Sequence, residues 1–274
     1  MTYLCASSAL EHFNKYGYLV VPALITNKDG ALQDAKNKCM HVVQQAAVEA
    51  SCPPPNTGRR GDDADDDDDD DEEEDEDLSW IVTGHGCIFE VPTSNEARTA
   101  RRRDEYVRAA KGTCLNNVVE RAAHTVAACL GAETFENNVR LFNDQYIVKP
   151  PQSTSAFGWH TDDQGVRKEN AHTAPYVSVW IALDDADEQS GCLWVRNAKR
   201  KRDEEGEGEH DKGKPLVVNA GDAVILRHDV EHRSSANRAR RWRCAYMPQF
   251  SLGTVAFRDG SPVALDVELR DATL

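Results

Sequence analysis

Long apolar runs are missing from this sequence, and so are the signals of an exported protein. No stretch approaches the roughly 20 apolar residues of a membrane-spanning helix, and Met1 to Phe13 lacks the charged start and apolar core of a secretory signal. The C-terminal Ala-Thr-Leu also differs from the Ser-Lys-Leu address of peroxisomal proteins. We therefore expect a cytoplasmic protein that has no membrane partner.

Closely spaced cysteines are missing as well. The eight cysteines are scattered along the chain and include no Cys-x-x-Cys pair, so the sequence indicates neither a structural zinc site nor a disulfide framework. We expect reduced thiols in a reducing compartment.

A basic excess of the kind that binds nucleic acid is also absent. The formal net charge is −15, but residues 62–77 contain fifteen acidic residues, and without them 32 acidic residues face 32 Lys and Arg. This balance argues against a nucleic-acid partner. The Pro-rich and acidic segment 53–77 is too self-repelling and too poor in apolar residues to pack, so we expect a disordered insertion. It would serve either as a solvated loop or as a docking site for a basic protein.

The apolar pattern predicts helices in the first half of the chain and short strands in the second. Helical spacing covers Leu10–Tyr18, about residues 28–50 and about residues 95–130, and Tyr18–Val21 is predicted as a strand. Further predicted strands cover residues 139–148, 177–183, 192–195, 216–218, 223–226 and 242–250. Many short strands separated by turn residues indicate a sandwich or barrel. We predict a mainly β fold with helices, as one domain over residues 1–274: an N-terminal helical layer on a jelly-roll barrel (double-stranded β-helix, cupin-like).

The most informative motif is His160-Thr161-Asp162, followed further along the chain by His232. Alternate side chains of an extended segment share one face, so His160 and Asp162 can both point into a barrel. Two imidazoles and one carboxylate can hold Fe(II) on one face and leave three positions for a bidentate co-substrate and O2. The set suggests an iron-dependent oxygenase, but a lone His-x-Asp also arises by chance.

Arg243 lies in the apolar, aromatic segment 242–250. A charged residue in a largely buried strand is costly unless it is paired, so we expect a carboxylate partner for it. That partner is either an Asp or Glu of the protein or the distal carboxylate of 2-oxoglutarate, which a planar guanidinium can bind through two hydrogen bonds.

The segment from His228 to His232 also matches the His-x-x-Glu-His pattern of inverted zinc peptidases. That pattern requires a helix, because only there do two histidines four residues apart share one face. Here it follows a predicted strand and no helical apolar period surrounds it, so the peptidase interpretation is disfavoured.

Six blocks of the sequence point to a known family. They are residues 13–22 (FNKYGYLVVP), 143–151 (NDQYIVKPP), 159–162 (WHTD), 179–186 (VWIALDDA), 190–195 (SGCLWV) and 232–237 (HRSSAN). In type and order they resemble the phytanoyl-CoA dioxygenase family of Fe(II)- and 2-oxoglutarate-dependent oxygenases. Among the long segments, only the acidic insertion falls outside the resemblance.

The resemblance implies that His160, Asp162 and His232 bind the iron and that Arg243 anchors 2-oxoglutarate. It further implies a group of residues around the co-substrate: Ser234 as a hydrogen-bond donor, Gln145 and Trp180 as pocket lining, and Lys149 either as a ligand contact or as part of the barrel mouth only. O2 would be the second co-substrate. The expected reaction is hydroxylation of an unactivated C–H bond in a small-molecule or acyl substrate, with release of succinate and CO2.

Residues 196–214 depart from the family pattern, because a charged loop stands where the family usually has Pro-Gly-Ser-His. In the family this segment covers the pocket, so the departure leaves the substrate open. A second hypothesis also stays open: a non-catalytic, metal-binding or regulatory protein on the same fold, which uses its acidic tract to recruit a partner.

Overall fold

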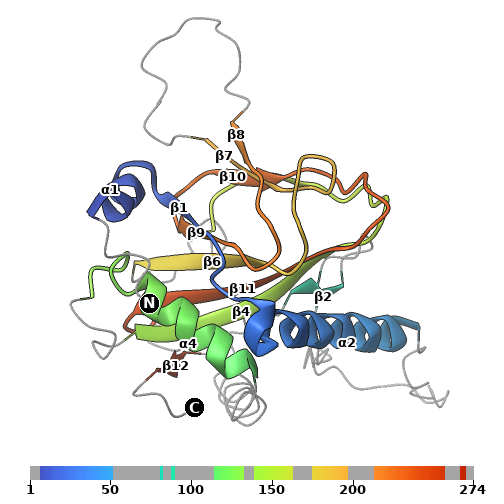
Figure 1. The fold of residues 1–274 in the computed structure, drawn as a ribbon, viewed down its shortest axis with the longest axis horizontal. Coiled ribbons are helices and arrows are strands. Elements are labelled where there is room, and N and C mark those ends of the chain that lie inside the picture. Colours follow the sequence, from blue (N-terminus) through green and yellow to red (C-terminus); the bar gives the residue numbers. More distant parts are fainter. Residues whose placement is uncertain are drawn as a thin grey trace, which may run out of the picture.

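Two antiparallel β-sheets form the body of the protein (Figure 1). The structure, a computed structural model, describes residues 7–51, 81–82, 88–89, 114–132, 139–162, 175–196, 213–256 and 266–269. The larger sheet consists, in spatial order, of β1 (Tyr18–Val21), β9 (Ala223–Arg227), β6 (Tyr176–Ala182), β11 (Arg243–Leu252), β4 (Val139–Lys149) and β12 (Val267–Glu268). The smaller sheet consists of β5 (Phe157–His160), β10 (His232–Ser234), β7 (Leu193–Val195) and β8 (Lys214–Leu216). A separate two-stranded pair is formed by β2 (Ile81–Val82) and β3 (Ile88–Phe89).

Helices α2 (Ala31–Ser51) and α4 (Cys114–Val126) pack on the side of the larger sheet that faces away from the smaller one (Figure 1). Helix α1 (Ser7–Tyr16) lies beside the edge strand β1, and the 3₁₀ turn η1 (Asn27–Asp29) precedes α2. Over the part of helix α4 whose side chains are described, residues 117–126, the buried face consists of Val and Ala at helical spacing: Val118, Val119, Ala122, Ala123 and Val126. These small side chains allow α4 to contact both α2 and strand β11.

Strand β6 is buried along its whole length because both of its faces are covered. Val179 and Ile181 pack in the cluster shared with the helices, whereas Trp180 and Ala182 pack in the cluster shared with the smaller sheet. A strand covered on both sides is expected to be a continuous apolar run. Ser178 is the polar exception in β6, and it is fully buried.

The outer face of the smaller sheet carries a stack of arginine and tryptophan side chains. The guanidinium of Arg196 lies 4.7 Å from the Trp159 ring centroid, and that of Arg233 lies 4.9 Å from the centroids of both Trp159 and Trp194. Gly213 makes room for this stack, since a Cβ atom there would come within 2.4 Å of the Trp159 ring. Cation–π contacts of this kind join three neighbouring strands.

The structure confirms the predicted fold class, with differences at the ends of some elements. The helix predicted from about residue 28 begins at Ala31, because the side chain of Thr26 accepts a hydrogen bond from Lys28 N and starts a 3₁₀ turn that ends at the left-handed Gly30. The strand predicted over 216–218 is observed over Lys214–Leu216. Val217 is 63% exposed and has left the sheet, so its apolar character does not mark a strand position.

Several expectations fall on other parts of the chain. The disordered insertion 53–77, the helical segment 95–113 and the charged loop between residues 197 and 212 lie outside the described residues. Within the described ranges, no helix combines the length and the apolar character that crossing a membrane requires. The four cysteines whose side chains are described, Cys39, Cys129, Cys192 and Cys244, are free thiols.

Candidate metal centre

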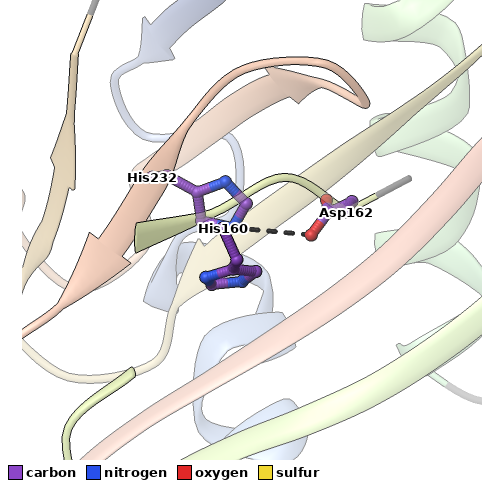
Figure 2. Close-up of side chains that lie close together, drawn as sticks. All are labelled: His160, Asp162 and His232. Carbon is purple, nitrogen blue, oxygen red and sulfur yellow. Dashed lines mark ion pairs between the residues drawn. The ribbon is translucent and has the colours of Figure 1, made fainter. Parts of the chain in front are cut away.

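The two histidines lie opposite each other on paired strands, and the aspartate lies beside them. His160 is the last residue of β5 and His232 the first of β10, and the antiparallel register pairs them directly. Their ring centroids are 4.2 Å apart. Asp162 follows His160 by two residues, and its Oδ1 atom lies 3.4 Å from Nε2 of His232 (Figure 2). The structure thus brings together three residues from distant parts of the sequence.

Backbone carbonyls determine which nitrogen of each ring carries the proton. Nδ1 of His160 donates to the carbonyl oxygen of Gly158 at 2.8 Å, and Nδ1 of His232 donates to that of Val230 at 3.0 Å. A carbonyl oxygen only accepts, so each neutral imidazole keeps its lone pair on Nε2. Burial, followed by the nearby His232, lowers the pKa of His160 below its ordinary value and favours the neutral ring. Both histidines can therefore offer Nε2 to a metal ion.

The three side chains fit the donor set of a single metal ion. One ligand atom from each of them lies within 4.8 Å of the other two. Adjacent octahedral ligands about 2.1 Å from an ion are about 3 Å apart, and the 3.4 Å between Nε2 of His232 and Oδ1 of Asp162 is close to that spacing. Two nitrogens and one carboxylate oxygen on one side of an ion suit Fe(II) and leave the opposite side open.

Arg243 and Lys149 bring two cations into the space between the sheets. They are cross-strand neighbours in β11 and β4, and both are buried, with 1% and 0% exposure. Nη1 of Arg243 donates to the carbonyl oxygen of Ile147 at 3.0 Å, and its guanidinium lies 5.5 Å from the ring centroid of Trp180. Trp180 belongs to the apolar cluster between the two sheets, so Arg243 points inward.

Lys149 is held by the backbone that follows β10. Its Nζ atom donates to the carbonyl oxygens of Ser234, at 3.3 Å, and Ser235, and it lies 5.4 Å from the ring centroid of Phe157. Ser234 is itself 4% exposed and shares strand β10 with His232. Gln145 is half-buried in β4, and its Nε2 atom donates to Gln249 at 3.4 Å.

The segment from His228 to His232 is not helical. His228 follows the end of β9 and stacks on Tyr176 at a centroid distance of 5.1 Å, whereas His232 opens β10. The two side chains therefore do not form the one-turn pair that a zinc peptidase needs.

Three polar residues near the metal centre are not predicted from the sequence. Ser178 donates a hydrogen bond to Oδ2 of Asp162, and Gln249 and Asn143 continue the contact deeper into the sheet. The sequence does mark Ser178 as unusual, because it is a polar residue within the otherwise apolar strand 176–182. The sequence does not show which residue it hydrogen-bonds to, because that depends on the register of the strands.

The family of the chain follows from a match over most of its length. A family model for phytanoyl-CoA dioxygenase (PhyH) matches residues 13–245. The chain belongs to this family. The resemblance of the six sequence blocks is therefore confirmed.

Solved structures similar to this member of the phytanoyl-CoA dioxygenase family include two proteins of nogalamycin biosynthesis. SnoK, a non-heme alpha-ketoglutarate-dependent carbocyclase, is 15% identical, with 98% of this chain and 96% of SnoK covered and a TM-score of 0.61. SnoN, a non-heme alpha-ketoglutarate-dependent epimerase, is 16% identical, with 93% and 85% covered and a TM-score of 0.57. At such low identity the likeness shows a common fold.

Two of the similar structures contain the expected ligands. EvdO2 from Micromonospora carbonacea var. aurantiaca was crystallised with 2-oxoglutarate; it is 16% identical, with 96% of this chain and 97% of EvdO2 covered and a TM-score of 0.54. A structure of SnoN contains Fe3+ and alpha-ketoglutarate. The iron and 2-oxoglutarate expected from the sequence are thus ligands of proteins with this fold.

Proposed function

We propose that this chain is a dioxygenase that uses Fe(II), 2-oxoglutarate and O2 to hydroxylate an unactivated C–H bond in a small-molecule or acyl substrate. The observation that carries the proposal is the cluster of His160, Asp162 and His232, whose ligand atoms lie within 4.8 Å of one another. Both imidazoles keep Nε2 as the lone-pair nitrogen because Nδ1 of each donates to the backbone. A cluster of this composition leaves three coordination positions for 2-oxoglutarate and O2.

Arg243 is the proposed anchor for the distal carboxylate of 2-oxoglutarate. Its guanidinium lies over Trp180, which is two residues from Ser178 and on the same face of β6. Two residues of a strand span about 7 Å, and Ser178 contacts Asp162 directly. A five-carbon diacid that chelates the metal at one end has the length to reach Arg243 with the other.

The remaining residues named from the sequence have supporting roles in this proposal. Ser234 lies on the buried side of β10 with His232 and would donate its hydroxyl to the distal carboxylate. Trp180 and Gln145 would form walls of the co-substrate pocket. Lys149 would hold the backbone of Ser234 and Ser235 in position, since its ammonium donates to both carbonyls.

Iron supplies the activation of O2, which no side chain can perform, and the protein supplies position and electrostatics. In the net reaction one oxygen atom enters succinate, formed with CO2 from 2-oxoglutarate, and the other becomes the hydroxyl group of the product. Asp162 supports hydroxylation over halogenation, because its carboxylate takes the position that a halide would need. SnoK and SnoN are named as a carbocyclase and an epimerase, so product analysis is needed to distinguish these outcomes.

The proposal is tested by anaerobic titration of the metal-free protein with Fe(II) and 2-oxoglutarate, followed by succinate measurement after O2 is admitted. We expect a metal-to-ligand charge-transfer absorption band and succinate release in the wild-type protein. The variant His160→Ala should lose both, because two ligands cannot hold the ion in a three-ligand site.

His228→Ala is the matched control, because His228 stacks on Tyr176 and belongs to none of the proposed ligands. It should keep the band and the succinate. Absence of the band in the wild-type protein, or unchanged succinate release in His160→Ala, would contradict the dioxygenase assignment and favour the non-catalytic alternative.

A further inference from the structure

A row of buried polar side chains crosses the inner face of the larger sheet and ends at Asp162. Asn143, Gln249 and Ser178 are 3%, 5% and 0% exposed and lie on the three adjacent strands β4, β11 and β6. The register pairs Gln249 with Asn143 on one side and with Ser178 on the other. The three side chains are therefore direct cross-strand neighbours.

The hydrogen bonds of this row all run in one direction. Nδ2 of Asn143 donates to Oε1 of Gln249 at 3.0 Å, Nε2 of Gln249 donates to Oγ of Ser178 at 2.9 Å, and the Ser178 hydroxyl donates to Oδ2 of Asp162. Gln145 adds a second donor to Oε1 of Gln249 at 3.4 Å. A hydroxyl has a single proton, and because Ser178 accepts from Gln249, that proton is directed at the carboxylate.

The end point of the row explains its direction. A carboxylate that binds a metal ion only accepts hydrogen bonds, so a chain of donors that leads to Asp162 matches what its free oxygen can accept. Successive hydrogen bonds polarise one another in a buried setting, which strengthens the last one. Buried polar side chains cost desolvation energy unless they are hydrogen-bonded, and here each of the three hydrogen-bonds to the next, while Oδ1 of Asn143, at the start of the row, has no hydrogen-bond partner.

We infer that Ser178, supported by Gln249, is a positioning residue that makes Asp162 a single-oxygen metal ligand. The hydroxyl of Ser178 occupies Oδ2, while Oδ1 is the oxygen that lies 3.4 Å from Nε2 of His232. A carboxylate that turned to offer both oxygens would take one of the positions that 2-oxoglutarate and O2 require. The row of donors thus keeps the open side of the metal centre open. This inference rests on the proposed function, but its test separates the two.

The test is titration of the metal-free protein with Co(II) alone, followed through the visible d–d absorption, which reports both affinity and coordination number. The wild-type protein should bind one equivalent of Co(II). Ser178→Ala should bind at least about tenfold more weakly, the lower end for loss of an outer-shell partner, and its spectrum should change as the freed Oδ2 approaches the ion. Ser178→Thr keeps the hydroxyl and should restore both the affinity and the spectrum.

Ser251→Ala is the matched control for removal of a buried hydroxyl. Ser251 is also fully buried in the larger sheet, but its Oγ donates to the carbonyl of Gly253, away from Asp162. This variant should bind Co(II) as the wild type does. Gln249→Met removes the donor to Ser178 without altering Ser178 itself, and it should weaken Co(II) binding by a smaller factor than Ser178→Ala does. If Ser178→Ala does not fold, Gln249→Met takes its place as the test variant.

The outcomes distinguish the inference from the proposed function. If the wild-type protein fails to bind Co(II), the metal centre itself is wrong, and both fail. If the wild type binds Co(II) while folded Ser178→Ala and Gln249→Met show unchanged affinity and spectra, the positioning role is overturned and the dioxygenase proposal stands.

Discussion

Two buried cations lie side by side between the sheets, and their hydrogen bonds give them different tasks. The ammonium of Lys149 donates to two backbone carbonyls, which is a structural use of its charge. The guanidinium of Arg243 donates to one carbonyl through Nη1 and lies over Trp180. Arginine presents five donors in a planar fork that matches a carboxylate, whereas lysine presents a point charge. Residue type therefore favours Arg243 as the group that binds the co-substrate.

The variant Arg243→Lys should bind 2-oxoglutarate at least about tenfold more weakly, equivalent to about 1.4 kcal/mol, because the paired hydrogen bonds are lost while the charge remains. Co(II) affinity should stay at the wild-type value. Both are measured by titration, with the co-substrate added to the metal-loaded protein under anaerobic conditions. Arg241→Lys is the control, since Arg241 is two residues away and pairs with Asp187 at the surface. Equal 2-oxoglutarate affinity in Arg243→Lys and the wild type would remove Arg243 from the site.

At the scale of elements, a single amide joins the end of β4 to the connection between β10 and β11. Nδ2 of the fully buried Asn237 lies 3.0, 2.9 and 2.8 Å from the carbonyl oxygens of Lys149, Pro150 and Arg241, which share its two protons. Its Oδ1 accepts from Ala239 N at 3.0 Å. This contact fixes the loop that follows His232 against the strand that carries Lys149.

Replacement of Asn237 by Ala should therefore lower the free energy of unfolding by about 2–4 kcal/mol, because several buried backbone groups lose their partner at once. Urea denaturation followed by circular dichroism measures this change. Asn219→Ala should change it by less than about 0.5 kcal/mol, since Asn219 is exposed. A similar small effect in both variants would show that solvent satisfies the carbonyls around Asn237.

Elements differ in how far the sequence predicts them. Strands β6, β9 and β11 follow from their apolar runs, since both faces of the larger sheet are covered. Strand β10 does not, because its three residues His-Arg-Ser contain no apolar signal and its place depends on pairing with β5 and β7. The spacing of histidine and aspartate indicates the proposed metal ligands, but the contact between Ser178 and Asp162 requires the register of strands distant in sequence.

At the scale of the whole molecule, the metal centre and its supporting row draw on residues 143–249 alone, across both sheets. The acidic tract 62–77 lies outside that span and carries all of the excess negative charge. Charge of this kind influences solubility and association more than fold. The role of the acidic tract can therefore be tested separately from that of the metal centre.

Deletion of residues 62–77 should leave Co(II) affinity unchanged while the formal net charge rises from −15 to zero, since 32 acidic residues remain against 32 Lys and Arg. Anion-exchange elution should shift to much lower salt, and solubility near neutral pH should fall. Co(II) affinity is measured by titration followed through the visible d–d absorption. Loss of Co(II) binding on deletion would show that the tract belongs to the metal centre or to the folding of the domain.

The stack on the outer face of the smaller sheet gives the chain a built-in optical reporter. Trp159 is the residue before His160, and the guanidinium groups of Arg196 and Arg233 lie 4.7 and 4.9 Å from the centroid of its ring. Indole emission depends on nearby charges, so a small movement of β5 would change the fluorescence of Trp159 although the ring faces away from the metal ligands. Binding on the inner side of the smaller sheet is thus expected to change the fluorescence of Trp159 on its outer side.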